Sequence, residues 1–132
     1  MILVDSSVWI DFFNGRTASH TGNLALLLDD MAPVAVADLV LFEVLRGFRH
    51  ERDYLAARKT MTALTVIAIG GEDNALQAAQ HDRLLRAMGY TIRRAVDVLQ
   101  ASYCIDHDYA LLHNDTDFDV MENLRGLRVW RH

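Results

Sequence analysis

Short runs of aliphatic residues alternate with longer amphipathic stretches along this chain. The short runs predict five strands, at residues 1–5, 34–36, 65–69, 110–113 and 127–130. The longer stretches predict helices, at residues 6–14, 21–31, 38–48, 51–64, 72–88, 95–106 and 116–124. Because strands and helices alternate, we expect an α/β fold in which helices flank a central, mostly parallel sheet of about five short strands.

Polar residues near the predicted helix starts indicate how the helices are capped. Asp5, Ser6 or Ser7 is expected to supply the N-cap of the first helix. Asp38 is expected to cap the third helix. The segment 116–119 resembles a capping box at the start of the last helix.

Five acidic residues interrupt apolar segments or follow predicted strands: Asp5, Glu43, Asp97, Asp115 and Asp117. A carboxylate that leaves water costs several kcal/mol unless it is paired, hydrogen-bonded or bound to a metal ion. In parallel α/β sheets, binding sites lie outside the carboxyl ends of the strands. Since these acids follow strands or lie early in helices, we expect them to face one crevice.

Each acid also has a purely structural interpretation. Asp5 and Asp115 are suited to helix N-caps, and Asp97, in a first helical turn, is stabilised by the helix dipole. Glu43 has apolar neighbours around its helix and is expected not to reach water easily; its alternative is a buried ion pair with an arginine such as Arg46. These interpretations are independent of one another, whereas one shared metal site explains all the positions together.

The ligand chemistry favours a hard cation. Oxygen ligands without a matching set of cysteines and histidines suit Mg²⁺, with Mn²⁺ as a possible substitute, rather than zinc. The six histidines show no H-E-x-x-H spacing. Neither a phosphate-binding glycine loop nor a G-x-S-x-G nucleophile motif is present. The sequence therefore predicts metal-assisted chemistry rather than a serine nucleophile.

Length and composition indicate the number of domains and the cellular environment of the protein. The 132 residues predict a single domain spanning positions 1–132. The single cysteine, Cys104, lies in an apolar stretch, which favours a buried thiol and a reducing, cytoplasmic setting. No signal peptide and no membrane-spanning segment are expected, so no membrane partner is predicted.

The formal net charge of −5 taken alone argues against a partner held by bulk attraction to phosphate. If cations bind the carboxylates, however, the arginines dominate the local field. The candidate substrate-binding residues are then Ser6, Ser7, Arg16, Arg46, Arg49, Arg93 and Arg94. Either serine has the alternative role of helix cap, and each arginine that of a solvated surface group.

Four segments that contain the acids resemble the motifs of a known family. They are residues 1–11 (MILVDSSVWID), 41–47 (LFEVLRG), 91–101 (TIRRAVDVLQA) and 111–118 (LLHNDTDF). In this order and over nearly the whole chain, they resemble PIN-domain nucleases, especially the VapC-type toxins of bacterial toxin–antitoxin pairs. The sequence departs from the family at His113-Asn114, where many relatives carry a threonine-led version, and at Gln100, where an aliphatic residue is common.

The resemblance implies a PIN-like fold and a Mg²⁺-dependent endoribonuclease, the toxin of a type II toxin–antitoxin pair. Such an enzyme would hydrolyse structured RNA such as tRNA or rRNA and inhibit translation. The resemblance also implies a homodimer and a cognate VapB-type antitoxin that forms a hetero-oligomer with the toxin and blocks its active site, often with an inserted arginine.

Our hypothesis is that Asp5, Glu43, Asp97 and Asp115 are catalytic and hold one or two Mg²⁺ ions, with Asp117 as an additional ligand. One alternative is a catalytically silent PIN-like module that binds RNA or protein. Another is a metal-dependent DNA nuclease or a phosphatase, although a phosphatase with a covalent aspartate would favour a D-x-D motif, which Asp5-Ser6-Ser7 lacks.

Overall fold

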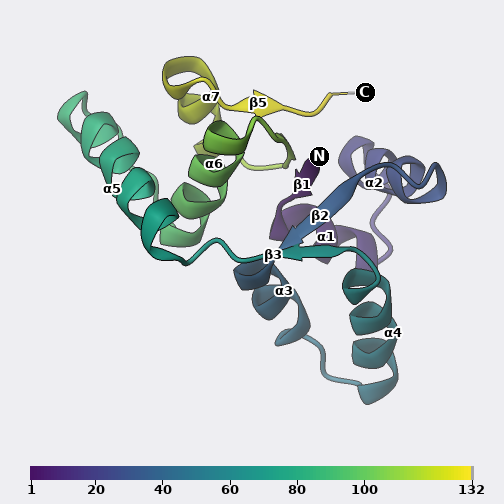
Figure 1. Cartoon of the computed structure of the whole chain (residues 1–132). Helices are drawn as coiled ribbons and strands as arrows, with labels where there is room; N and C mark the ends of the chain where they lie inside the picture. The colour runs from purple at the N-terminus through teal and green to yellow at the C-terminus, as the bar shows by residue number, and fades with distance from the viewer. Residues whose placement is uncertain (132) are drawn as a thin grey trace.

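Five short parallel strands form one sheet in the computed structural model, which describes residues 1–131 (Figure 1). The strand order is β3-β2-β1-β4-β5, and every pairing is parallel. The strands are β1 (Ile2–Val4), β2 (Val34–Ala37), β3 (Thr65–Ile67), β4 (Ala110–Leu112) and β5 (Arg128–Val129). The predicted α/β fold is confirmed, and most of the strands are shorter than the sequence indicated.

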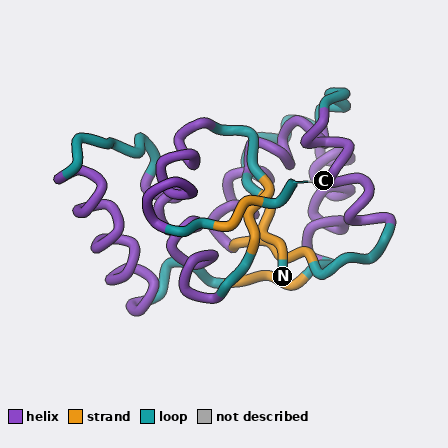
Figure 2. Tube along the Cα trace, turned by 90° about the horizontal axis from the view of Figure 1, so that it is seen from above, coloured by secondary structure: helices purple, strands orange, loops and turns teal. Residues whose placement is uncertain are grey.

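Helices lie on both sides of the strands (Figure 2). Within the described residues they are α1 (Ser6–Phe13), α2 (Ser19–Asp29), α3 (Asp38–Leu45), α4 (Glu51–Thr62), α5 (Glu72–Ala87), α6 (Ala95–His107) and α7 (Asp119–Arg125). A 3-10 turn, η1 (Thr116–Phe118), precedes α7. None of the described helices is both long and apolar enough to cross a bilayer.

The sheet buries both of its faces, because successive side chains of a strand point to opposite sides. Ile2 and Val4 of β1 pack in a cluster that includes residues of α1 to α4. Leu3, between them, packs in a second cluster with residues of α5, α6 and α7. Cys104 belongs to this second cluster, where burial raises the pKa of its thiol to about 12. The predicted buried thiol is therefore confirmed.

Two of the predicted helix starts need correction. The N-cap of α3 is Ala37 rather than Asp38, and Asp38 is instead the first helical residue. Its Oδ1 accepts hydrogen bonds from the backbone N–H groups of Leu39 (2.9 Å) and Ile69 (3.1 Å). The predicted capping box at 116–119 is also wrong, because Asp115 supplies the side-chain cap one residue earlier. Both corrections place an aspartate beside the end of a strand.

A helical hairpin of α5 and α6 covers one side of the sheet (Figure 1). The buried Asn74 near the start of α5 donates hydrogen bonds to the carbonyls of Ile69 (2.7 Å) and Leu99 (3.0 Å). These bonds join the segment after β3 to α6. The first turn of α6 is thereby fixed beside the carboxyl ends of the strands, where Asp97 lies.

Replacing a core side chain tests this packing. Leu111 in β4 is fully buried, so Leu111→Ala is expected to lower the free energy of unfolding by about 2–5 kcal/mol through lost contacts and an internal cavity. Leu76 on α5 is 64 % exposed, and Leu76→Ala is expected to change the free energy of unfolding by less than about 0.5 kcal/mol. Urea denaturation followed by circular dichroism measures both changes, and equal losses would contradict the assigned core.

Candidate metal centre

Asp5 lies directly after β1 and is the N-cap of α1. Its Oδ2 accepts hydrogen bonds from the Ser7 backbone N–H (3.1 Å) and the Ser7 hydroxyl (2.6 Å). Its Oδ1 accepts a 2.9 Å bond from the side-chain amide of Gln100 in α6. Asp5 is buried, so these donors offset part of its lost hydration and hold the carboxylate in one orientation.

Asp97 lies in the first turn of α6 and is only 1 % exposed. Neither carboxylate oxygen has a hydrogen-bond partner among the described residues. Burial, followed by repulsion from the Asp5 carboxylate, raises the pKa of the Asp97 carboxyl from 3.8 to about 6. A buried carboxylate that has acidic neighbours and no donor is unfavourable unless a cation compensates its charge.

Asp115 and Asp117 complete a cluster of three carboxylates with Asp97. Asp115 follows β4, and its Oδ1 accepts a 2.9 Å hydrogen bond from the Asp117 backbone N–H. One oxygen from each of the three carboxylates lies within 4.8 Å of the other two. Because β4 pairs with β1, Asp115 and Asp5 follow neighbouring strands at the point where the strand order reverses, the usual position of ligands in such sheets.

Glu43 on α3 is connected to this cluster through an arginine. Arg94 pairs with Oε2 of Glu43, and its Nη1 lies 3.8 Å from Oδ1 of Asp97. The expectation that Glu43 cannot easily reach water is wrong, since its side chain is 25 % exposed. The alternative of an ion pair with an arginine is confirmed, but the arginine is Arg94; the Arg46 guanidinium lies instead 5.4 Å from the centre of the Phe42 ring.

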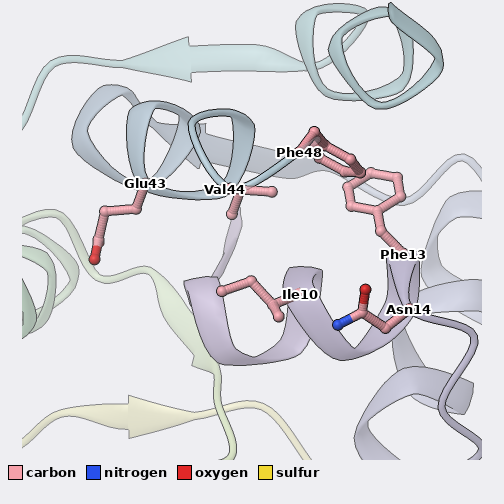
Figure 3. Close-up of a pocket in the computed structure, with 7 residues that line it drawn as sticks. Ile10, Phe13, Asn14, Glu43, Val44 and Phe48 are labelled. Carbon is pink, nitrogen blue, oxygen red and sulfur yellow. The ribbon is translucent and has the colours of Figure 1, made fainter. Parts of the chain in front are cut away.

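A small hollow of about 140 Å³ lies between α1 and α3 (Figure 3). Its wall is part apolar and part polar: Ile10 and Val44 lie between the helices, the Phe13 and Phe48 rings meet edge to face at 5.8 Å, and Asn14 and Glu43 also line it. Figure 3 shows the Glu43 side chain extending away from these apolar side chains. Glu43 thus lies at the edge of this hollow, and its carboxylate reaches the acidic cluster only through Arg94.

Two of the candidate phosphate-binding arginines contact the acids. Arg93 donates from Nε to Oδ2 of Asp117 at 3.0 Å, and Arg94 lies between Glu43 and Asp97. Of the other candidates, Arg16 pairs with Asp11, and Arg46 and Arg49 make no ion pair among the described residues. The hydroxyl of Ser7 is committed to Asp5, and Ser6 is buried. A role for any of these residues at a substrate stays a prediction.

His113 lies beside the cluster without joining it. Its Nδ1 accepts a 3.2 Å hydrogen bond from the Asp115 backbone N–H, and its ring packs near Phe118. Burial lowers the pKa of His113, which favours the neutral imidazole. These contacts position the loop that carries Asp115.

The sequence did not identify Gln100 as a partner of Asp5. It appeared only as a polar residue at a position that is commonly aliphatic. In the structure Gln100 is fully buried, one helical turn after Asp97, and its amide holds the Asp5 carboxylate. The signal available in the sequence was the three-residue spacing from Asp97, which places both side chains on one face of α6.

The cluster fits a divalent cation that prefers oxygen ligands. Both carboxylate oxygens of Asp97 are buried without a hydrogen-bond partner in the described part of the chain. One oxygen of Asp115 and one of Asp117 lie close enough to an Asp97 oxygen for the three to share one ion. No cysteine or histidine belongs to this group within residues 1–131. An all-carboxylate set suits Mg²⁺ or Mn²⁺.

The chain is similar in sequence and in fold to known proteins. A family model for the PIN domain matches residues 2–124. Ribonuclease VapC11 of Mycobacterium tuberculosis is 28 % identical over 135 residues, with 98 % of this chain and 97 % of that protein covered. The fold is similar to that of VapBC2 from Rickettsia felis bound to a DNA fragment from its promoter, with a TM-score of 0.77, 20 % identity and 98 % of each chain covered. It is also similar to VapC20 of M. tuberculosis, described as a sarcin-ricin loop cleaving toxin, with a TM-score of 0.67, 24 % identity, and 91 % of this chain and 94 % of that one covered.

Because the buried Asp97 carboxylate has no hydrogen-bond donor among the described residues, removing its charge is expected to stabilise the metal-free protein rather than destabilise it. The pKa of the Asp97 carboxyl is raised in the folded protein, so the contribution of this group to the stability of the metal-free protein is expected to fall as the pH rises from about 4 through about 6. Asp97→Asn is therefore expected to stabilise the metal-free protein at pH 7.5 by up to roughly 3 kcal/mol, and the gain is expected to shrink toward pH 4. Urea denaturation in EDTA at several pH values measures this change.

Asp82 provides the matched control, because it pairs with Arg86 at the surface of α5. Asp82→Asn is expected to change the free energy of unfolding by less than about 0.5 kcal/mol at either pH. A loss of stability in Asp97→Asn at pH 7.5 would contradict the idea that this carboxylate is strained without a cation.

Gln100→Leu tests whether the hydrogen bond from Gln100 to the Asp5 carboxylate stabilises the fold. The variant removes a buried donor to a carboxylate while filling similar space, and it is expected to lower the free energy of unfolding by about 1–3 kcal/mol. Gln80→Leu, at an exposed position of α5, is the control and is expected to have little effect. Denaturant unfolding measures both variants; unchanged or higher stability of Gln100→Leu would argue against a structural role for this bond.

Proposed function

The chain belongs to the PIN-domain family, and from this premise we propose that it is a Mg²⁺-dependent endoribonuclease, the toxin of a type II toxin–antitoxin pair. One observation carries the proposal: within residues 1–131 the Asp97 carboxylate is buried beside Asp115 and Asp117 without a hydrogen-bond partner, and its nearest cationic group, Arg94 Nη1, lies 3.8 Å away. If these acids served only as helix caps, Asp97 would be expected to accept hydrogen bonds from its own helix, and it accepts none. A bound cation gives that carboxylate a favourable partner.

The named relatives support the nature of the substrate and partner. Similarity to a VapC ribonuclease along almost the whole chain favours RNA as the substrate. The description of VapC20 as a toxin that cleaves the sarcin-ricin loop favours a structured RNA such as rRNA or tRNA, whose cleavage inhibits translation. The VapBC2 complex favours a cognate VapB-type antitoxin as the protein partner. A homodimer and a cytoplasmic location accord with this family.

The proposed metal ligands are Asp5, Glu43, Asp97 and Asp115, with Asp117 as an additional ligand. When bound, one or two Mg²⁺ ions would make a water molecule more acidic and offset charge on the phosphate and the leaving oxygen. Ser7 and Gln100 keep the Asp5 carboxylate aimed in one direction, so that no reorientation is needed when substrate arrives.

The proposed substrate contacts lie around the acids. Arg93 and Arg94 are near enough to the acids to bind a phosphate that enters the cluster. Ser6, Arg16, Arg46 and Arg49 are proposed as more peripheral contacts. A nucleotide that is unstacked in a loop can enter such a site, whereas one inside a regular helix cannot, so exposed loops of structured RNA are the favoured targets.

Purified protein is expected to cleave structured RNA in Mg²⁺ and to lose activity in excess EDTA. Asp5→Asn and Glu43→Gln preserve side-chain shape, and Asn still serves as an N-cap, so both variants are expected to fold. Each is expected to reduce the cleavage rate by at least about 100-fold, because a ligand charge is lost. Gel analysis of cleaved RNA with mapping of the new 5′ ends measures rate and position, and Asp82→Asn is the control.

Substrate comparison separates this function from its alternatives. Parallel assays with RNA, single-stranded DNA and a small phosphomonoester distinguish a ribonuclease from a DNA nuclease or a phosphatase. Calorimetric titration with Mg²⁺ and Mn²⁺ distinguishes an enzyme from a silent binding module, which is expected to bind neither ion well. Equal cleavage of RNA in EDTA would overturn the proposed mechanism.

A further inference from the structure

Arg94 is a basic side chain placed among the acids of the site. Its guanidinium pairs with Oε2 of Glu43 and lies 3.8 Å from Oδ1 of Asp97. The side chain is 42 % exposed, so part of it remains in contact with water. Arg94 therefore links an acid of α3 to an acid of α6, two elements that are far apart in the sequence.

This arginine satisfies the acids only in part. The second oxygen of Glu43 and both oxygens of Asp97 are buried without a hydrogen-bond partner. The 3.8 Å separation from Asp97 is too long for a hydrogen bond, so Arg94 offers that carboxylate electrostatic attraction alone. Its charge nevertheless lowers the pKa of Asp97 against the larger effects of burial and Asp5.

The backbone gives Arg94 little other reason to stay near the acids. Arg94 is the N-cap of α6 and makes no side-chain capping bond. A positive side chain is unfavourable at a helix N-terminus, where the helix dipole is itself positive. Attraction to Glu43 and Asp97 must therefore outweigh the dipole, and that attraction disappears once another cation neutralises these acids.

We propose that Arg94 is the resident counter-ion of the metal-free acidic cluster and that it leaves Glu43 when a divalent cation binds. The proposal rests on the proposed metal site. Arg94 and the cation compete for the same carboxylate oxygens, and their like charges repel at close range. Arg94 thereby stabilises the metal-free protein and weakens cation binding, so it sets the concentration of Mg²⁺ at which the site fills. Its partial exposure lets the displaced guanidinium remain hydrated.

The chain contains two matched comparisons. Arg93 is the adjacent residue, and it pairs with Asp117 at the edge of the cluster while its side chain is 75 % exposed. Arg16 pairs with Asp11, which is outside the cluster, and it is also largely exposed. If competition for the acids sets the cation affinity, the three arginines should affect it in the order Arg94, Arg93, Arg16.

Calorimetric titration with Mg²⁺, repeated with Mn²⁺, tests this order on the wild-type protein and three glutamine variants. Arg94→Gln is expected to bind either ion about three- to thirtyfold more tightly, because one competing ion pair and one repulsion are removed. Arg93→Gln is expected to show a smaller gain, and Arg16→Gln no change. Arg94→Lys, which keeps the charge, is expected to stay closer to the wild type than Arg94→Gln.

Thermal unfolding with and without metal separates this role from a merely structural one. In EDTA, Arg94→Gln is expected to melt below the wild type, because Glu43 and Asp97 lose their counter-ion. On addition of Mg²⁺, its melting temperature is expected to rise by more than that of the wild type, as tighter binding requires. A purely structural role would lower both melting temperatures and leave the metal-dependent rise unchanged.

The outcomes distinguish this inference from the proposed function. If the wild type binds Mg²⁺ and Arg94→Gln binds it equally or more weakly, the inference is overturned while the metal site stands. If neither protein binds Mg²⁺ or Mn²⁺ at millimolar concentrations, both proposals are overturned. Tighter binding together with a larger metal-dependent rise in melting temperature supports the role of Arg94 as a competing counter-ion.

Discussion

A buried carboxylate without a hydrogen-bond partner is the constraint on which this site depends. Asp97 is held in the first turn of α6, away from water, with Asp5, Asp115 and Asp117 as neighbours whose charges oppose its ionisation. Such a group is expensive to keep charged in a folded protein. The fold tolerates it because it is a small local cost beside two buried faces of a parallel sheet. The unfavourable charge of Asp97 therefore lies where a bound cation would compensate it. Groups with such perturbed pKa values are typical of functional sites.

The sheet supplies the geometry that brings the acids together. Asp5 and Asp115 follow β1 and β4, which are adjacent although more than 100 residues apart in sequence. The order reverses at this pair, since β2 and β3 extend the sheet on one side and β5 on the other. The Asn74 bonds that tie α6 to the segment after β3 keep Asp97 at the same edge. The grouped carboxylates therefore come from α6 and the segment after β4, while β1 brings Asp5 beside them.

The sequence was informative where local pattern and topology determine position. Apolar runs that end in an acid located Asp5 and Asp115, and the rule that parallel strands end at one edge was enough to bring them together. Partners chosen by side-chain packing could not be derived in this way. Glu43 pairs with Arg94, 51 positions away, rather than with nearby Arg46, and Gln100 reaches Asp5 across 95 positions. The spacing of Gln100 from Asp97 places it on the same face of α6, but local spacing does not identify Asp5 or Arg94 as the distant partners. The prediction that Asp38 caps α3 was wrong for a related reason: Asp38 is the first helical residue, and its carboxylate binds the distant Ile69 backbone as well as that of Leu39.

Charge balance at the site links the cation to the substrate. When all are ionised, five carboxylates and two arginines leave the metal-free site with an excess of three negative charges. An RNA phosphate is repelled by such a field at short range. One divalent cation reduces the excess to a single negative charge, and a second makes the site positive. The guanidinium groups of Arg93 and Arg94, no longer attracted to neutralised acids, then add to the attraction for phosphate rather than being cancelled. The net charge of −5 is thus compatible with a nucleic-acid substrate, provided that cation binding precedes it.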